Sequence, residues 1–359
     1  TSLIISFLVT LVGIYGTGPI LKFLKTNPEI IFYAKDYMDI IFLGASLFFL
    51  QLTINSFLVS RGDTKSLRNV LIITFFLNLV LNPIFIYGLY FIPAMGIKGI
   101  ALATLCSQLF GLIYIILKVN KTNLKKFLNP ECFIPKYNLQ KEILSQTIPA
   151  TISMMLIGLG VFVLLFYVST YGDYSAGGYG AAIRFEQLFL LPVLGLNAST
   201  LALVGQNFGA MNFVRIHETY TRSIFYGTLF MGICGLFVFF SSDYIMYFFS
   251  DNDEIIFYGS TYLKIAAFAG PCYPIFFISS ALLQGLKKPN YQMVINLMRM
   301  VILPVCGLSV AVLYLQVNFT TMFLVVLTIN YVFAAAVYKF SVYQIDLMQK
   351  NYKPNLDAV

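Results

Sequence analysis

The stretch 180–210, GAAIRFEQLFLLPVLGLNASTLALVGQNFGA, decides how the whole chain is interpreted. It can span a bilayer, because a membrane helix needs about 20 mostly apolar residues. It contains Arg184, Glu186 and Gln187, and ionisable groups within a membrane helix are costly enough to mark a cavity, a partner or a transport path. Pro192 follows, and a proline can kink a membrane helix beside a polar cavity. The three polar residues are therefore candidates for contacting a substrate or a coupling ion; the alternative is an ion pair between Arg184 and Glu186 near the outer interface.

The composition indicates an all-α protein that crosses the bilayer many times. Of the 359 residues, 59% are hydrophobic and 11% are charged, whereas about 25% of the residues in ordinary soluble proteins are charged. The net charge is +8, but the Lys and Arg residues are spread over short loops, so we expect no nucleic-acid partner. An excess of Lys and Arg is instead typical of loops that stay on the cytoplasmic side of a membrane.

Apolar runs separated by Gly, Pro and charged residues predict ten membrane helices. We expect them over residues 2–24, 34–60, 66–89, 95–118, 141–171, 175–205, 214–241, 254–285, 289–315 and 318–342. Alternate connections, such as those with Arg61 and Lys65 and with Lys287 and Lys288, carry most of the Lys and Arg residues. Because basic loops stay on the cytoplasmic side, we expect both ends of the chain to be cytoplasmic.

A basic connection that contains two prolines interrupts an otherwise tightly looped chain at about residues 119–140. We interpret this connection as a cytoplasmic linker between two lobes. The predicted organisation is an N-terminal lobe at 1–128, which ends in the linker from about residue 119, a C-terminal lobe at 137–345 and a cytoplasmic tail at 346–359.

An internal repeat supports the two lobes. The sequence EIIFY at 29–33 recurs at 254–258, and Tyr37 and Tyr262 follow at the same offset. Parallel repeats of this kind place a substrate site between the two halves. The two helices that open the second half have no counterparts after Thr1. We therefore expect two helices to be absent from the N-terminus of this chain and the complete protein to have twelve.

Neutral polar side chains form a second candidate site. Asn78 and Asn82 are four residues apart and thus share one helix face, and Thr104 lies in the next predicted helix. Amide and hydroxyl oxygens are hard ligands that suit Na⁺. The alternative is hydrogen bonding between helices, for which membrane proteins commonly use Asn and Thr.

Arg299 is a further cation within an apolar run and precedes Pro304. It could balance Glu186 across a cleft, or its side chain could extend to the inner membrane interface. We favour the second interpretation.

The residues give no catalytic arrangement. The one histidine, His217, falls in a predicted loop, and there is no Walker motif for ATP. We therefore expect neither an enzyme nor an organic cofactor.

Several motifs together resemble those of multidrug and toxic compound extrusion (MATE) transporters, over essentially the whole chain. They are RGDTK at 61–65, LNLVLNPIFIYG at 77–88, MGIKGIALAT at 95–104, AAIRFEQLFLLPVLGLN at 181–197, GQNFGA at 205–210 and QGLKKP at 284–289. The resemblance implies a bundle of two parallel six-helix lobes, of which this chain would hold helices three to twelve. It also implies a monomer in the bacterial cytoplasmic membrane that exports organic, usually cationic, compounds in exchange for Na⁺ or H⁺.

The resemblance carries over to the site residues only in part. It implies ion-binding positions at Asn78 and Asn82 on the fifth helix and at Thr104 on the sixth, although many members have aspartate where this chain has Asn82. A second branch of the family uses carboxylates in the seventh and tenth helices, which this chain lacks. Glu186 is then the carboxylate of the C-terminal lobe that remains as a coupling candidate.

Two other functions fit the sequence less well. A flippase for lipid-linked sugars would need several Arg and Lys residues in its cavity, and only Arg184 and Arg299 are available. A membrane receptor or scaffold would not explain the parallel repeat, because two similar halves are typical of a transporter that alternates between two states.

Overall fold

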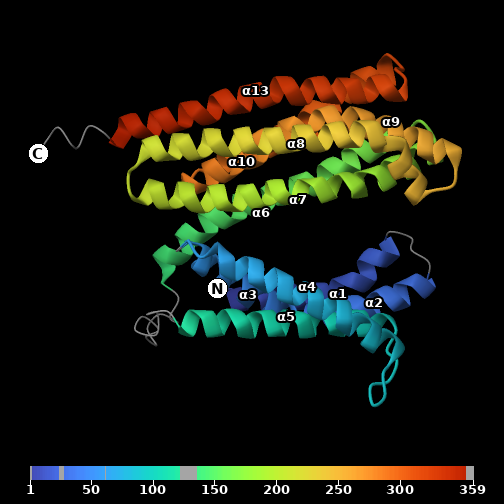
Figure 1. Ribbon diagram of the computed structural model, residues 1–359, viewed down its shortest axis with the longest axis vertical. Coiled ribbons are helices and arrows are strands. Elements are labelled where there is room, and N and C mark those ends of the chain that lie inside the picture. The colour runs from blue at the N-terminus through green and yellow to red at the C-terminus, as the bar shows by residue number, and fades with distance from the viewer. Residues whose placement is uncertain (1, 24–27, 61, 122–135, 353–359) are drawn as a thin grey trace, which may run out of the picture. The chain divides into compact units, whose positions relative to one another are not determined.

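The computed structural model describes residues 2–23, 28–60, 62–121 and 136–352 (Figure 1). Within these ranges the chain is helical except for turns and one isolated bridge between Leu89 and Ile92. Within the described residues, nine helical segments are long and apolar enough to cross a membrane, or ten if a bent pair counts as one span; two of the nine are the composite runs Asp253–Gly285 and Pro289–Tyr314. The predicted all-α membrane fold of about ten spans is therefore confirmed.

The chain divides into two compact units, Thr1–Gln140 and Lys141–Val359, which we call the N-terminal and C-terminal units. The central part of the predicted linker, residues 122–135, lies outside the described residues. The same holds for the last part of the predicted tail, residues 353–359.

Five helices of the N-terminal unit lie within the described residues. They are α1 (Ser2–Phe23), α2 (Pro28–Leu43), α3 (Ala45–Ser60), α4 (Thr64–Tyr87) and α5 (Ile97–Asn120). The single helix expected over 34–60 is wrong, because α2 and α3 meet at Gly44 with a bend of 45°. Gly44 lies so close to Leu105 of α5 that any side chain at this position would overlap it.

The described part of the C-terminal unit contains four helices of more than 30 residues and four shorter ones. They are α6 (Tyr137–Ser169), α7 (Asp173–Gly209), α8 (Phe213–Phe249), α9 (Asp253–Ala269), α10 (Tyr273–Gly285), α11 (Pro289–Leu297), α12 (Leu303–Leu308) and α13 (Phe319–Tyr352). A 3₁₀ turn at Gly270–Cys272 joins α9 to α10. The π turns Met298–Ile302 and Ser309–Tyr314 flank α12. Such wide turns are rare and frequently lie at functional sites.

The last helix extends further than the sequence predicted. We expected it to end near 342 and a tail to begin at 346, but α13 continues to Tyr352, so the first part of that tail is helical. Ile345 explains the difference, because it is buried and packs with Leu282 and Leu286 of the neighbouring elements. Tertiary packing stabilises helices more than propensity does, so the apolar contact prolongs this one.

Aromatic rings hold α7, α9 and α13 together. The ring of Tyr262 lies edge-on to that of Tyr179 at 4.9 Å and to that of Phe323 at 4.8 Å. Phe319 contacts Phe323 in the same cluster. Edge-to-face pairs of this kind stabilise a fold by about 0.5–1.5 kcal/mol each beyond area burial. The cluster fixes the position of Tyr262 and thereby one wall of the site described below.

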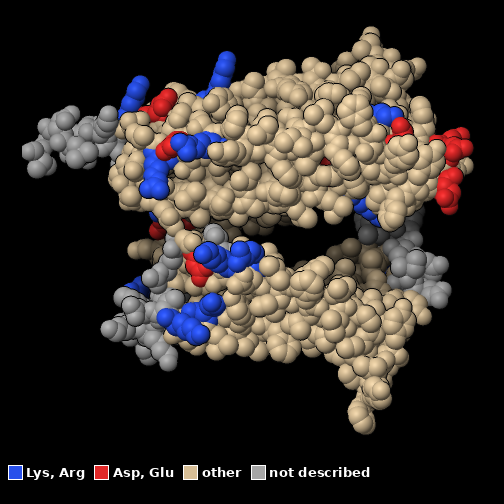
Figure 2. Space-filling model, viewed as in Figure 1, with Lys and Arg blue, Asp and Glu red and all other residues tan. Residues whose placement is uncertain are grey.

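The charged side chains are distributed as expected for a membrane protein. On the face of the C-terminal unit shown in Figure 2, Lys, Arg, Asp and Glu gather mostly toward the ends of the helices, and the stretch between them is largely uncharged. At one end Lys287 pairs with Glu142 at 2.7 Å. This arrangement leaves an apolar belt that suits the hydrocarbon layer.

The start of α4 has a well-formed N-cap outside the membrane spans. A carboxylate oxygen of Asp63 accepts a hydrogen bond from the backbone N–H of Ser66 at 3.0 Å, and the other accepts one from the Ser66 hydroxyl at 2.6 Å. These two bonds to Ser66 hold the pKa of Asp63 below its ordinary value. The cap satisfies a helix N–H that would otherwise have no partner.

Asp63→Ala is expected to destabilise the protein by about 1 kcal/mol at neutral pH, the usual cost of losing an N-cap. Because the folded-state pKa is lowered, the contribution of Asp63 is complete above its unfolded pKa of about 3.9 and is lost as the pH falls through the folded-state value. Thermal unfolding in detergent at pH 7 and at about pH 3 measures the difference. Asp63→Asn keeps the cap at both pH values and is the control. An equal deficit of Asp63→Ala at the two pH values would contradict the assignment.

Candidate functional site

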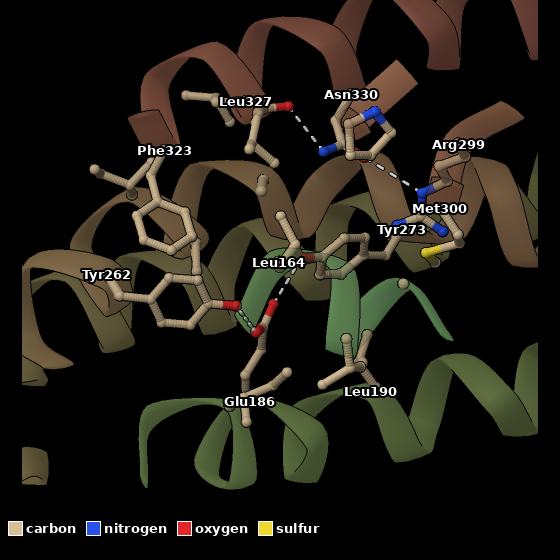
Figure 3. Close-up of a pocket in the computed structure, with 18 of the residues that line it drawn as sticks. Leu164, Glu186, Leu190, Tyr262, Tyr273, Arg299, Met300, Phe323, Leu327 and Asn330 are labelled. Carbon is tan, nitrogen blue, oxygen red and sulfur yellow. Dashed lines mark hydrogen bonds between the residues drawn. The ribbon is translucent and has the colours of Figure 1, made fainter. Parts of the chain in front are cut away.

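Glu186 of α7 lies at a cavity of about 180 Å³ inside the C-terminal unit (Figure 3). Residues from α6, α7, α9, α10, α12, α13 and the π turn Met298–Ile302 line it. Most of the lining is apolar, such as Leu164, Leu190 and Phe323, and a few polar groups converge on the interior. Pockets for drug-sized ligands usually measure about 300–1,000 Å³, so this cavity suits a small ion, water or a proton.

Two tyrosines hold the carboxylate of Glu186. The hydroxyl of Tyr262 on α9 donates to Oε2, and the hydroxyl of Tyr273 on α10 donates to Oε1 at 2.7 Å (Figure 3). Hydroxyl donors stabilise the ionised carboxylate, whereas removal from water favours the protonated acid. The surroundings of Glu186 therefore stabilise both forms of its carboxyl group: the hydroxyl donors stabilise the ionised form, and the apolar lining favours the protonated form.

Arg299 lies in the π turn and lines the same cavity. It is 9% exposed. The carbon of its guanidinium is 3.9 Å from the ring centroid of Phe276 and 5.2 Å from that of Tyr273. Its Nε donates to Oδ1 of Asn330 on α13 at 3.3 Å.

The preferred interpretation, in which Arg299 extends to the membrane interface, is therefore wrong. Two aromatic faces and an amide oxygen replace water around the guanidinium. The structure agrees better with the alternative, in which Arg299 balances Glu186. Tyr273 connects the two charges, because its hydroxyl bonds to the carboxylate and its ring faces the guanidinium. No direct ion pair joins Glu186 and Arg299.

Of the other two candidates on α7, Gln187 lines the Glu186 cavity and Arg184 does not. Arg184 is exposed and makes no ion pair with Glu186, so the alternative interpretation of that stretch is wrong. The physical reason is helical geometry, since residues two apart point to different sides of a helix. Gln187 follows Glu186 directly and lines the cavity with it.

The three polar candidates of the N-terminal unit come together. Nδ2 of Asn82 donates to Oδ1 of Asn78 at 2.7 Å, and Nδ2 of Asn78 donates to the hydroxyl of Thr104 on α5 at 3.3 Å. The Thr104 hydroxyl donates to the carbonyl of Ile100 at 3.0 Å. Oδ1 of Asn82 is buried without a hydrogen-bond partner. The set links α4 to α5 and leaves one acceptor oxygen free for a cation or water.

The sequence did not predict Tyr262, Tyr273 and Asn330 as members of the site. Tyr262 entered the sequence argument as part of the repeat, where its offset from Tyr37 is a weak signal of importance. Tyrosine is common in apolar runs, and no spacing shows that its hydroxyl reaches a carboxylate on another helix. Among the described residues, no group of three or more His, Cys, Asp and Glu could hold a metal ion.

A bundle of membrane helices that encloses a carboxyl group and an arginine beside a cavity is the architecture of a membrane transport protein. The sequence model of the MatE family matches residues 1–84 and 149–308. The chain therefore belongs to the MatE family, and the resemblance to MATE transporters is confirmed.

Individual relatives agree with this assignment. The chain is 28% identical over 289 residues to the "probable multidrug resistance protein YpnP" of Bacillus subtilis, an alignment that covers 79% of this chain and 63% of that protein. It is 25% identical to the "FAD transporter" of Shewanella oneidensis, with the same two shares of 79% and 63%. The chain thus spans less than two thirds of the length of these two relatives.

Solved structures show the same fold. A MOP superfamily transporter from Pyrococcus furiosus superposes with a TM-score of 0.88, covering 96% of this chain and 76% of that one. The two sequences are 21% identical, so the match establishes the shared architecture alone.

Proposed function

We propose that the protein is a secondary active exporter of organic compounds that works by antiport with a cation. The observation that supports this most directly is Glu186, a carboxyl group between two tyrosine hydroxyls at a cavity that also contains Arg299. Such a group can gain and lose a proton inside the membrane, and a ligand can shift a two-state equilibrium by its differential affinity for the states. A further relative, 24% identical over 285 residues, is the "multidrug export protein MepA" of Staphylococcus haemolyticus, whose name supports export as the direction of transport.

The surroundings of Glu186 favour H⁺ over Na⁺ at this position. Each carboxylate oxygen already accepts a hydrogen bond from a tyrosine hydroxyl, so fewer of its lone pairs remain for a metal ion. The guanidinium of Arg299 at the same cavity would repel a metal ion. The neutral oxygens of Asn78, Asn82 and Thr104 are the set that suits Na⁺.

The substrate is expected to be an organic cation held outside the 180 Å³ cavity, which is too small for a drug-sized molecule. One observation favours a second substrate class. Arg184 is exposed on a membrane-spanning helix, and its positive charge would attract an anionic compound. One relative is named a FAD transporter, and FAD is an anion. A lipid-sugar flippase has less support, because Arg299 is engaged by aromatic rings and Asn330.

The proposal includes an orientation in the membrane. Lys287 and Lys288 lie between α10 and α11, and Lys118 and Lys121 lie at the end of α5. The positive-inside rule places these connections in the cytoplasm of a bacterial cell and the protein in its cytoplasmic membrane. We expect a monomer with both ends of the chain inside.

Transport in inverted membrane vesicles tests the proposal. The full protein is assayed with ethidium, an organic cation, and separately with FAD, while a Na⁺ gradient and a pH gradient are imposed one at a time. We expect the pH gradient to drive ethidium uptake and a protonophore to abolish it. Uptake of FAD alone would support the second substrate class. Movement of neither compound under either gradient would contradict the exporter.

A further inference from the structure

A second cavity of about 300 Å³ adjoins the Glu186 cavity within the C-terminal unit. Ile157, Phe277 and Arg299 line both cavities, so these three residues form the boundary between them. We call the 300 Å³ space the polar cavity, because its lining includes amides and hydroxyls from α6, α7, α10 and α11. Its lining residues include no acidic side chain.

One polar stripe leads along α11 toward the boundary. Gln292, Asn296 and Arg299 follow one another at spacings of four and three residues, so they share a face of the helix and its π turn. All three line the polar cavity. They are 9%, 3% and 9% exposed, so the stripe is buried from the first turn of α11 to the boundary at Arg299.

The polar stripe contains an unsatisfied acceptor. Oε1 of Gln292 is buried and has no hydrogen-bond partner within the protein. A buried polar atom without a partner costs about 1–3 kcal/mol, so it normally bonds to water. A cavity volume of about 10–15 Å³ is enough for one water molecule, and the polar cavity is far larger. Its polar lining and its size therefore indicate a water-filled space.

The polar cavity reaches the protein surface away from Arg299. Thr147 and Thr151 of α6 line it and are exposed. This end lies near the connection between α10 and α11, because Nε2 of Gln146 donates to the carbonyl of Lys287 at 3.5 Å. Water that enters here belongs to the side of the membrane on which Lys287 lies.

Arg299 is held firmly at the boundary. Its guanidinium faces the rings of Phe276 and Tyr273, and its Nε bonds to Asn330. The next residue, Met300, packs against Gly160 of α6 so closely that a Cβ at 160 would lie 2.8 Å from its sulfur. A fixed positive charge beside a narrow aqueous path repels cations, including the hydronium ion.

We propose that the polar cavity is a water-filled vestibule that opens on the Lys287 side of the membrane, and that Arg299 is the barrier between this vestibule and the Glu186 cavity. In the exporter, Glu186 exchanges its proton with that side through the vestibule when Arg299 moves aside. A vestibule water accepts the proton and the carboxylate remains, with Arg299 as its nearby counter-charge. The proton exchange of Glu186 rests on the proposed function, whereas the vestibule and its barrier do not.

Thiol labelling tests the vestibule without any transport measurement. Ser280 of α10 lines the polar cavity and is 6% exposed, whereas the adjacent Ser279 is 0% exposed, does not line it, and has its hydroxyl 2.8 Å from that of Tyr220. The five native cysteines are first replaced by serine or alanine. Single variants Ser280→Cys and Ser279→Cys are then treated with a positively charged, membrane-impermeant methanethiosulfonate reagent from each side of sealed vesicles.

We expect Ser280→Cys to react from the Lys287 side at least about tenfold faster than Ser279→Cys, because residue 280 lines the cavity, whereas a thiol at 279 is reached only by local opening. From the opposite side, both variants should react slowly. Equal rates for the two variants, or faster labelling of Ser280→Cys from the opposite side, would overturn the vestibule.

The barrier is tested with Ala269→Cys, a small substitution in the wall of the Glu186 cavity. From the Lys287 side we expect little labelling when Arg299 is present, an increase of about tenfold or more in Arg299→Gln, and protection again in Arg299→Lys, which restores the charge. Rapid labelling in the presence of Arg299, or no increase in a folded Arg299→Gln variant, would overturn the barrier. If Arg299→Gln does not fold, the labelling of Ser280→Cys still tests the vestibule. Neither labelling experiment depends on transport, so a failure of the proposed function would leave these expected patterns unchanged.

Discussion

Glu186→Gln is expected to reduce coupled export strongly while leaving the protein folded. An amide cannot take up or release a proton, and its NH₂ group cannot accept the hydrogen bond of one of the two tyrosines. Binding at one site usually changes the affinity at a coupled site by a factor of about 5–150. We therefore expect gradient-driven uptake to decrease by about 5- to 150-fold in the variant. The measurement is ethidium accumulation in inverted vesicles under an imposed pH gradient, normalised to the amount of folded protein.

Two companion variants sharpen the interpretation. Glu186→Asp retains a carboxyl group and should keep part of the coupling. Tyr273→Phe removes the donor to Oε1 without changing the shape of the cavity, and it should reduce uptake less than Glu186→Gln does. If Glu186→Gln accumulates ethidium like the unmodified protein, coupling lies elsewhere, and Asn78, Asn82 and Thr104 become the residues to test.

Gly178→Ala is expected to be among the most destabilising small substitutions in the C-terminal unit. At this position α7 passes against α9, and a Cβ on Gly178 would lie 2.7 Å from the carbonyl oxygen of Ile255 and 2.8 Å from the backbone nitrogen of Gly259. Backbone atoms cannot move aside like a flexible side chain, so the helices must separate. Overpacking of this kind costs about 1–3 kcal/mol. The separation would also disturb the contact between Tyr179 and Tyr262 next to the site.

Gly180→Ala is the matched control for this prediction. A Cβ at Gly180 meets no atom within 4 Å, and the helix is the same. Alanine is more favourable than glycine inside a helix by about 0.5–1 kcal/mol, so this variant should gain stability. Thermal unfolding in detergent compares the two, with an expected change of about 2–4 °C per kcal/mol for a unit of this size. Shifts of equal sign and size would contradict the close approach at Gly178.

Several properties of this protein follow from the sequence by itself. The apolar composition excludes a soluble protein, and the runs between breakers locate the spans, because lipid leaves every backbone group to be satisfied within the helix. Helical spacing places Asn78 and Asn82 on one face, and the structure joins them by a hydrogen bond. Motifs distributed along the chain indicated the MATE family. Glu186 could be singled out because an acid in an apolar run is rare.

Tertiary structure decided which groups meet. The partners of Glu186 come from α9 and α10, the rings that surround Arg299 come from α10, and the amide that it contacts comes from α13. Such contacts depend on how each helix is rotated and how closely it approaches its neighbours, which a local pattern does not encode. The same holds for the bend at Gly44, where the close approach of Leu105 determines the path of the chain. Residue types and spacing therefore determine the membrane helices and the family, whereas packing between distant segments determines the chemistry available to each buried charge.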